Sequence, residues 1–294
     1  MSGLFRKKDV NDLLAEATPL TRTLKTMDLT FLGIGAIIGT GIFVLTGKGA
    51  LTAGPALSVS FLLAAVCCGF TGLCYAEFAS MAPVAGSAYT YSYLAFGEII
   101  AFIIGWDLIL EYALGAATVS VGWSGYFLNL LSEMGIHIPT VLTAAAGTTP
   151  GVTTYFNLPA FLIVLVITWI ISVGINQTKR VNDTMVIIKL AVIVLFIICT
   201  VWFIKPHNWV PFSPYGFYSY HAGAKAGILP AASIVFFSFI GFDSVASSAE
   251  ETINPSKTLP RGILLSLLIS TVLYIAMTLI MTGVVKYTVF TKYL

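Results

Sequence analysis

Long apolar runs separated by short polar segments dominate the chain. Seven of these runs have about 20 residues or more, which is the length a helix needs to cross the roughly 30 Å hydrocarbon core of a bilayer. They predict an all-α membrane protein with transmembrane helices at 28–52, 56–81, 98–131, 158–176, 184–204, 226–253 and 262–285. The third predicted helix is long enough that it must tilt or project beyond the bilayer.

Two of the seven runs contain residues that weaken a helix. The first has four glycines, at positions 33, 35, 39 and 41, and each costs about 1 kcal/mol of helix propensity relative to alanine. The sixth has Gly241, Asp243 and several serines where an apolar helix is expected. Inside hydrocarbon every backbone N–H and C=O needs a partner within the protein. We therefore expect both helices to open their backbone toward a buried cavity, which is a candidate ligand site.

The positions of the two interrupted helices predict an inverted repeat. They are five helices apart, and an odd offset reverses the direction in which a helix crosses the membrane. Paired broken helices in inverted repeats point to the midplane binding site of a transporter. This pattern divides the chain into a tail (1–27), a first five-helix repeat (28–204) and the first two helices of a second repeat (226–294). Two complete repeats require ten helices, so we expect the chain to be part of a longer protein that is truncated at its C-terminus.

Composition and charge support a multi-pass membrane protein. The chain is 57% hydrophobic and only 10% charged, and its net charge of +2 points to no nucleic-acid partner. The tail carries five basic residues but no apolar core, so it is no signal peptide. Basic residues favour the cytoplasmic side, which predicts a cytoplasmic N-terminus in the cell membrane. The segments 132–157 and 205–224 are then external, and the second, rich in Trp and Tyr, predicts an aromatic interfacial cap.

The polar residues offer no enzyme chemistry. All four cysteines lie inside apolar runs, where they are expected to pack as small hydrophobic side chains. The three histidines have no ligand spacing, and neither a nucleophile–base pair nor a phosphate-binding loop stands out. We expect no enzyme activity, no metal and no cofactor.

Six segments in register resemble the amino acid–polyamine–organocation superfamily of permeases, in particular its bacterial cationic-amino-acid-transporter-like branch. They are residues 33–43 (GIGAIIGTGIF), 53–56 (AGPA), 75–79 (YAEFA), 83–91 (PVAGSAYTY), 241–243 (GFD) and 250–261 (EETINPSKTLPR). The resemblance covers essentially the whole chain. It implies the five-plus-five inverted-repeat fold, with about seven of an expected twelve helices present and helices 1 and 6 broken. It also implies secondary active transport of amino acids, by exchange or together with an ion.

The broken helices predict how an amino acid is held. Unwound backbone at residues 38–41 leaves N–H groups free at the start of an outer half-helix, where the helix dipole favours a carboxylate. Free carbonyls at the ends of the half-helices suit the ammonium group. The expected substrate-binding residues are Ile37, Ile38, Gly39, Thr40 and Gly41 on helix 1, with Phe237, Ser238 and Ile240 on helix 6. The alternative is that Gly35 and Gly39, four apart, only allow close helix packing.

Lys189 lies within the fifth apolar run, about 8 Å from its cytoplasmic start at 1.5 Å per residue. Snorkelling to the interface is one explanation. The resemblance implies another, because proton-coupled relatives place a lysine where sodium-coupled ones hold an ion. Lys189 is then the candidate proton carrier, and H⁺ is the expected coupling ion.

Four acidic residues inside or near the apolar runs complete the candidate set. Asp107 and Glu111 stand four apart on helix 3, hence on one face, and intramembrane acids are functional candidates by default. Glu111 is expected to tune the substrate pocket, to favour a substrate with a cationic side chain, or to form a structural hydrogen bond to a neighbouring helix. Asp107 is expected to have a gating or structural role. Asp243 is expected to brace the unwound part of helix 6, with a direct substrate contact as the alternative, and Glu77 to act in gating or at a helix end.

Two other functions compete with a proton-coupled or exchanging permease. A sodium-coupled amino acid or amine transporter has the same fold, and Lys189 argues against it. Seven spans also suggest a heptahelical receptor, but a broken first helix has no role in that architecture. The expected partners are an amino acid substrate and the lipid bilayer. The identity of the amino acid and the oligomeric state are not indicated by the sequence.

Overall fold

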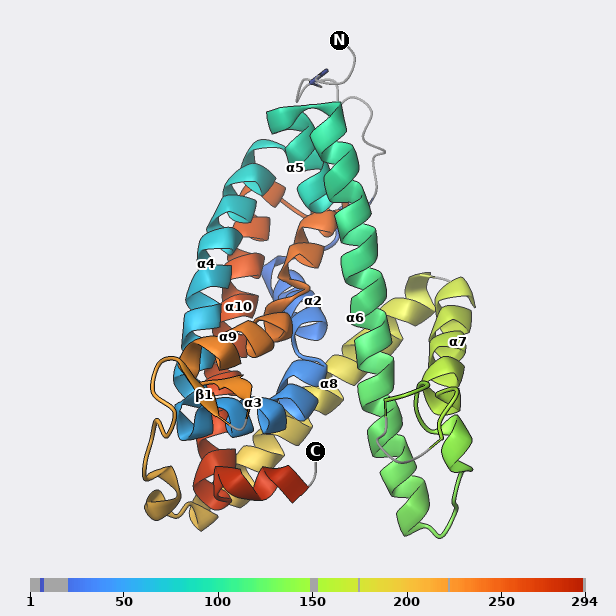
Figure 1. Cartoon of the computed structure of the whole chain (residues 1–294). Coiled ribbons are helices and arrows are strands. Elements are labelled where there is room, and N and C mark those ends of the chain that lie inside the picture. Colours follow the sequence, from blue (N-terminus) through green and yellow to red (C-terminus); the bar gives the residue numbers. More distant parts are fainter. Residues whose placement is uncertain (1–5, 8–20, 149–152, 174, 222, 293–294) are drawn as a thin grey trace. The chain divides into compact units, whose positions relative to one another are not determined.

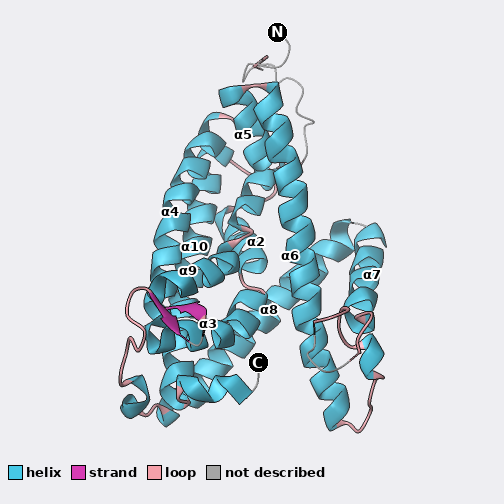
Figure 2. Cartoon of the chain, in the orientation of Figure 1, coloured by secondary structure: helices cyan, strands magenta, loops and turns pink. Residues whose placement is uncertain are grey.

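The computed structural model describes residues 6–7, 21–148, 153–173, 175–221 and 223–292, and these are almost entirely helical (Figure 1, Figure 2). Among them, five helical stretches are long and apolar enough to cross a membrane: Gly41–Met81, Glu98–Glu133, Asn182–Phe203, Ile228–Glu251 and Pro255–Val284. Two shorter apolar helices, Thr26–Ile37 and Leu158–Ser172, lie where the first and fourth predicted spans fall. The all-helical membrane architecture is confirmed.

The chain forms two compact units, of which the first comprises Met1–Gly105 and Asp183–Leu294. Its helices are α2 (Thr26–Ile37), α3 (Thr46–Ala53), α4 (Leu57–Met81), α5 (Ser87–Phe96), α9 (Ile228–Phe236) and α10 (Pro255–Val284), with the start of α6 (Glu98–Glu133) and most of α8 (Ile175–Thr200). The helices α4 and α10 pack side by side, and α2 packs against α10 (Figure 1). At the centre the rings of Phe61, Phe239 and Tyr274 contact one another and are fully buried.

The first predicted transmembrane helix is broken at mid-length, as expected. The helix α2 ends at Ile37, and Ile38 has extended backbone with φ −78° and ψ 98°. A π-helical turn, Gly41–Leu45, then leads into α3. Figure 1 shows α2 and α3 as two separate helices. The glycine-rich sequence explains the break, because residues with low helix propensity lose little by leaving the helix.

The sixth predicted helix is broken in the same way. The helix α9 continues into a 3₁₀ turn, Phe237–Phe239, after which Ile240 is extended. Gly241 follows with φ +109°, a conformation that residues with a side chain rarely adopt. A 3₁₀ segment, Phe242–Glu251, completes the helix.

Several predicted boundaries are wrong. The loop expected between spans four and five is helical, because α8 begins at Ile175 rather than at 184. The last helix, α10, begins at Pro255 instead of 262, because a proline in the first turn needs no N–H partner. The helix α5 and a hairpin of β1 (Ser219–His221) and β2 (Ala224–Ala226) were not anticipated.

The ends of two helices are joined by main-chain hydrogen bonds. Thr23 and Leu24 donate their N–H groups to the Glu251 carbonyl, at 2.9 and 3.0 Å. Ile253 in turn donates to the Leu24 carbonyl at 2.9 Å. Leu24 and Thr252 form a parallel bridge and are both buried. The residues just before α2 are therefore held against the junction between the 3₁₀ segment and α10.

The predicted aromatic cap is anchored to helix ends. Asn208 donates through Nδ2 to the Gly283 and Val284 carbonyls, at 2.7 and 3.1 Å. The indole of Trp209 donates to the Leu279 carbonyl at 3.2 Å. The Gly283 and Val284 carbonyls lie in the last turn of α10, where carbonyls lack helical partners, and Asn208 supplies a donor to both. The segment also receives the Ala56 N–H on the Phe212 carbonyl at 2.9 Å.

The second compact unit, Trp106–Asn182, holds most of α6 and all of α7 (Leu158–Val173). Asn157 starts α7, accepting the Ala160 N–H on Oδ1 at 3.0 Å, as an N-cap residue does. The same oxygen accepts the Ser124 hydroxyl of α6 at 2.7 Å. Within this unit the two helices are therefore joined through one amide side chain. The 132–157 segment includes a short 3₁₀ turn, Thr140–Leu142.

Candidate functional site

The two broken helices meet at their breaks. A Cβ atom added to Gly41 would lie 2.4 Å from the Cβ and Oγ of Ser238 and 2.7 Å from its Cα. One added to Gly241 would lie 3.0 Å from the Ala36 Cβ and carbonyl oxygen. Only glycine allows this approach, so the break of helix 1 and the break of helix 6 are in direct contact. The predicted residues of the two breaks are thereby brought together.

This site contains buried polar groups without partners. The hydroxyls of Thr40 and Ser238 are buried, and neither has a hydrogen-bond partner among the described residues. The first N–H groups of the helix that restarts at Gly41 also lack intrahelical acceptors. Buried polar groups without a hydrogen-bond partner are rare in folded proteins. A bound ligand would supply the missing partners. The geometry favours an anion here, because N–H groups and the positive end of a helix dipole coincide.

Lys189 of α8 lies at the same break. Its ammonium donates to the Gly35 carbonyl at 2.5 Å and to the Ile38 carbonyl at 2.7 Å. Both carbonyls belong to the end of α2, where the helix dipole is negative and cations are favoured. The Lys189 side chain thus points into the protein at the first break. It does not snorkel to the membrane interface.

Tyr274 of α10 is a member of the site that the sequence reasoning missed. Its hydroxyl oxygen lies 2.9 Å from the Ile37 carbonyl oxygen and 2.7 Å from the Ser238 carbonyl oxygen. The side chain is fully buried. The sequence places this tyrosine in the middle of an apolar span, where its hydroxyl needs a partner, but it does not indicate which residues supply that partner. Ile37 and Ser238, predicted to offer carbonyls to an ammonium group, therefore each contact one shared hydroxyl.

The remaining predicted residues of helices 1 and 6 lie at the breaks. Gly39 is half-buried and sits between α2 and the turn that starts at Gly41. The Phe237 carbonyl accepts the Ile240 N–H at 3.3 Å, which closes the 3₁₀ turn.

The acidic candidates lie on different helical segments. Asp243 is buried and accepts the Ser87 hydroxyl on its carbonyl oxygen at 3.4 Å and on its carboxylate at 3.5 Å. It connects helix 6 to α5, and its expected bracing of unwound amides stays a prediction. Glu77 is exposed near the end of α4. Asp107 and Glu111 lie on α6 in the second compact unit, so their roles stay predictions.

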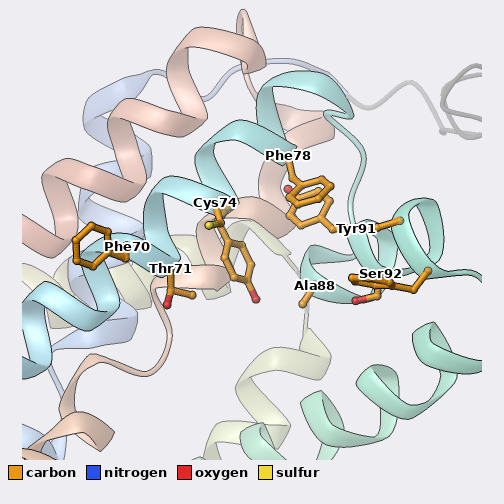
Figure 3. Close-up of a pocket in the computed structure, with 10 residues that line it drawn as sticks. Phe70, Thr71, Cys74, Phe78, Ala88, Tyr91 and Ser92 are labelled. Atoms are coloured by element: carbon orange, nitrogen blue, oxygen red, sulfur yellow. The ribbon is translucent and has the colours of Figure 1, made fainter.

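A cavity of about 350 Å³ lies between α4 and α5 (Figure 3). It is lined by Phe70, Thr71, Cys74, Tyr75, Phe78, Ala88, Tyr91, Ser92, Ala95 and Phe96. Phe78 and Tyr91 stack at its edge, with ring centroids 5.2 Å apart. None of the predicted substrate-binding residues contributes to it. The cavity is therefore separate from the site at the two breaks.

The sequence profile of the amino acid permease family matches residues 24–292. The chain belongs to this family. The match begins just before α2 and includes both broken helices. The residues at the two breaks therefore lie within the part of the chain that matches the family.

Individual proteins with similar sequences are also permeases or transporters by name. A branched-chain amino acid permease of Bacillus subtilis (strain 168) is 56% identical over 98% of this chain and 61% of its own length. The methylthioribose transporter of the same strain is 48% identical, also over 98% of this chain and 61% of its own length. Cationic amino acid transporter 9 of Arabidopsis thaliana is 41% identical over 93% of this chain and 47% of its own length. The chain thus spans less than two thirds of the length of these relatives, all of which are named as permeases or transporters.

Proposed function

We propose that this chain belongs to a secondary active transporter that moves an amino acid across the cell membrane. The observation that carries the proposal is the meeting of two broken helices at unpaired buried hydroxyls, those of Thr40 and Ser238. Membrane proteins tolerate broken helices only where the freed backbone lines a protected site. Inverted repeats with paired breaks use that site for substrate, and alternating access exposes it to one side at a time.

The two charged ends of an amino acid match the two kinds of backbone group in the site. The carboxylate binds the N–H groups that begin at Gly41, together with the Thr40 hydroxyl. The ammonium binds the carbonyls at the C-terminal ends of α2 and of the 3₁₀ turn Phe237–Phe239, near Ile37 and Ser238. Both assignments follow the helix dipoles, which place positive charge at a helix start and negative charge at a helix end.

Lys189 couples transport to protons in this proposal. Its ammonium donates to the Gly35 and Ile38 carbonyls, and carbonyl oxygens are also the kind of ligand that a sodium ion takes. A fixed cation on these carbonyls supports proton coupling or exchange over sodium coupling. Loss of the lysine proton would remove a charge from the end of α2 and weaken its hold on the break.

The relatives suggest which substrate to test first. The 56% identical relative is named a branched-chain amino acid permease, so L-leucine is the first candidate. A second candidate follows from the 48% identical methylthioribose transporter. Methylthioribose is a neutral sugar without ammonium or carboxylate, whereas the broken helices offer groups for both charges. The site therefore favours the amino acid.

The N-terminus is placed in the cytoplasm in this proposal, because the tail carries more basic residues than any predicted loop. Helix 1 then starts at the cytoplasmic side and helix 6 at the external side. This arrangement is what a first repeat (28–204) and an inverted second repeat (from 226) require.

The test is binding and uptake with purified protein of natural length in liposomes. We expect L-leucine to raise the melting temperature and to be taken up, and Thr40→Ala to weaken its binding about ten-fold, the effect of one lost hydrogen bond to a charged group. The matched control is Thr52→Ala, because the Thr52 hydroxyl is exposed and bonds only its own helix, at the Lys48 carbonyl. Binding of methylthioribose in preference to every amino acid would contradict the proposal.

A further inference from the structure

The hydroxyl of Tyr274 lies between two carbonyl oxygens and is in hydrogen-bond distance of both. It lies 2.9 Å from the Ile37 oxygen and 2.7 Å from the Ser238 oxygen. A tyrosine hydroxyl has a single proton, so one full hydrogen bond is available for two acceptors. Three oxygen atoms therefore share one proton in a fully buried position.

The surrounding backbone makes this cluster more negative. Ile37 is the last residue of α2, and Ser238 lies in the 3₁₀ turn that ends the first half of helix 6. Both carbonyls thus belong to C-terminal helix ends, where the dipole places partial negative charge. The two carbonyls share the single proton of the Tyr274 hydroxyl, and a group that brings several N–H donors and a positive charge would give each oxygen a donor of its own. A primary ammonium has three donors and fits this requirement.

We propose that the Tyr274 hydroxyl oxygen is the third ligand of the substrate ammonium, beside the Ile37 and Ser238 carbonyls. This inference rests on the proposed amino acid transport. It adds a residue of α10 to a site built from helices 1 and 6. When the ammonium is bound, Tyr274 accepts one of its protons and keeps its own proton on a carbonyl. Each of the three oxygens then has a donor.

The same arrangement gives Tyr274 a second consequence. Its hydroxyl contacts the inner half of helix 1 and the outer half of helix 6 at once. An ammonium that binds the three oxygens ties these half-helices to α10 more tightly than the single hydroxyl proton does. Ligands without an ammonium group lack this effect.

The experiment compares L-leucine with its des-amino analogue 4-methylpentanoate in the wild type and in Tyr274→Phe. We expect wild-type protein of natural length to bind L-leucine more tightly. Tyr274→Phe should weaken L-leucine binding about ten-fold, as expected for one charge-assisted hydrogen bond, and leave 4-methylpentanoate unchanged. The matched control is Tyr91→Phe, because the Tyr91 hydroxyl is also buried but has no partner among the described residues. It should change neither affinity.

Three results would overturn the inference. If Tyr274→Phe weakened the binding of both ligands equally, the role of Tyr274 would be structural. If L-leucine bound as tightly as before or more tightly, Tyr274 would be excluded as a ligand of the ammonium. Should Tyr274→Phe fail to fold, Tyr274→3-fluorotyrosine keeps the hydroxyl proton between the two carbonyls but makes the oxygen a poorer acceptor. An unchanged L-leucine affinity in that variant is the third overturning result, and a two- to three-fold loss, on the order of a few tenths of a full hydrogen bond, supports the inference. Absence of any amino acid binding in the wild type would instead refute the proposed function.

Discussion

Replacing Gly41 by alanine tests whether the two broken helices must touch. The added Cβ would lie 2.4 Å from the Ser238 Cβ and Oγ, whereas ordinary contacts begin at 3.4 Å. The helices must therefore separate by about 1 Å, and the Ser238 Cα at 2.7 Å means that rotation of one side chain cannot relieve the clash. Overpacking of this kind costs about 1–3 kcal/mol.

We expect Gly41→Ala to lower the melting temperature of the purified protein and to weaken L-leucine binding by ten-fold or more. The loss of binding follows because both walls of the site shift together, and a binding site must be held to within about 0.5 Å. Thermal unfolding and equilibrium binding in detergent measure the two effects separately.

Two variants make this prediction sharp. Gly69→Ala on α4 places a Cβ with nothing within 4 Å, so it should raise stability by about 0.5–1 kcal/mol through helix propensity. Gly41→Ala combined with Ser238→Gly removes two of the three clashing atoms and should recover part of the lost stability. If Gly41→Ala behaved like Gly69→Ala, the close approach of the breaks would be refuted.

Three further predictions concern other parts of the molecule. Lys189→Met leaves the Gly35 and Ile38 carbonyls without their donor, so stability should fall by about 1–3 kcal/mol and L-leucine uptake should lose its dependence on pH in liposomes. Gly241→Ala forces a side chain into φ +109°, and the strain should cost about 1–3 kcal/mol in thermal unfolding. Asn208→Ala removes a donor from two carbonyls at the end of α10, of which the Gly283 carbonyl keeps the Lys205 N–H, and this should cost about 1 kcal/mol without altering L-leucine affinity.

Each of these has an outcome that would contradict it. Uptake by Lys189→Met that still varied with pH as in the wild type would exclude the lysine as the proton carrier. An unchanged melting temperature for Gly241→Ala would mean that the left-handed break is absent. Weaker L-leucine binding in Asn208→Ala, at unchanged stability, would give the cap a role in substrate binding.

The helical class, both breaks and the residues at the breaks were predictable because each depends on local sequence. Gly39 and Gly41 lower helix propensity where they stand, and Gly241 marks a backbone conformation that needs glycine. The contribution of Tyr274 was not predicted, because it depends on where α10 packs against helices 1 and 6. Such contacts between residues 237 positions apart leave no local pattern.

Some boundaries were missed for a different physical reason. Polar and basic residues before 184 indicated a loop, yet α8 begins at Ile175, because polar residues extend a helix readily once it leaves the hydrocarbon. The helix α5 was missed because it has ten residues, too few for a membrane-crossing pattern. Ser87 connects it to Asp243, a long-range contact that sequence spacing does not reveal.

The main-chain bridge between residues 23–24 and 251–253 sets an energy scale for motion. Pulling the beginning of α2 away from the end of helix 6 breaks three hydrogen bonds, at roughly 0.5–1.5 kcal/mol each. A state in which only one of the two helix ends has moved away would then be populated at about one molecule in ten to one in two thousand. The inexpensive motion is a joint rotation of both ends about the breaks at mid-membrane. If this end of the protein opens and closes during transport, the start of helix 1 and the end of helix 6 should therefore move together.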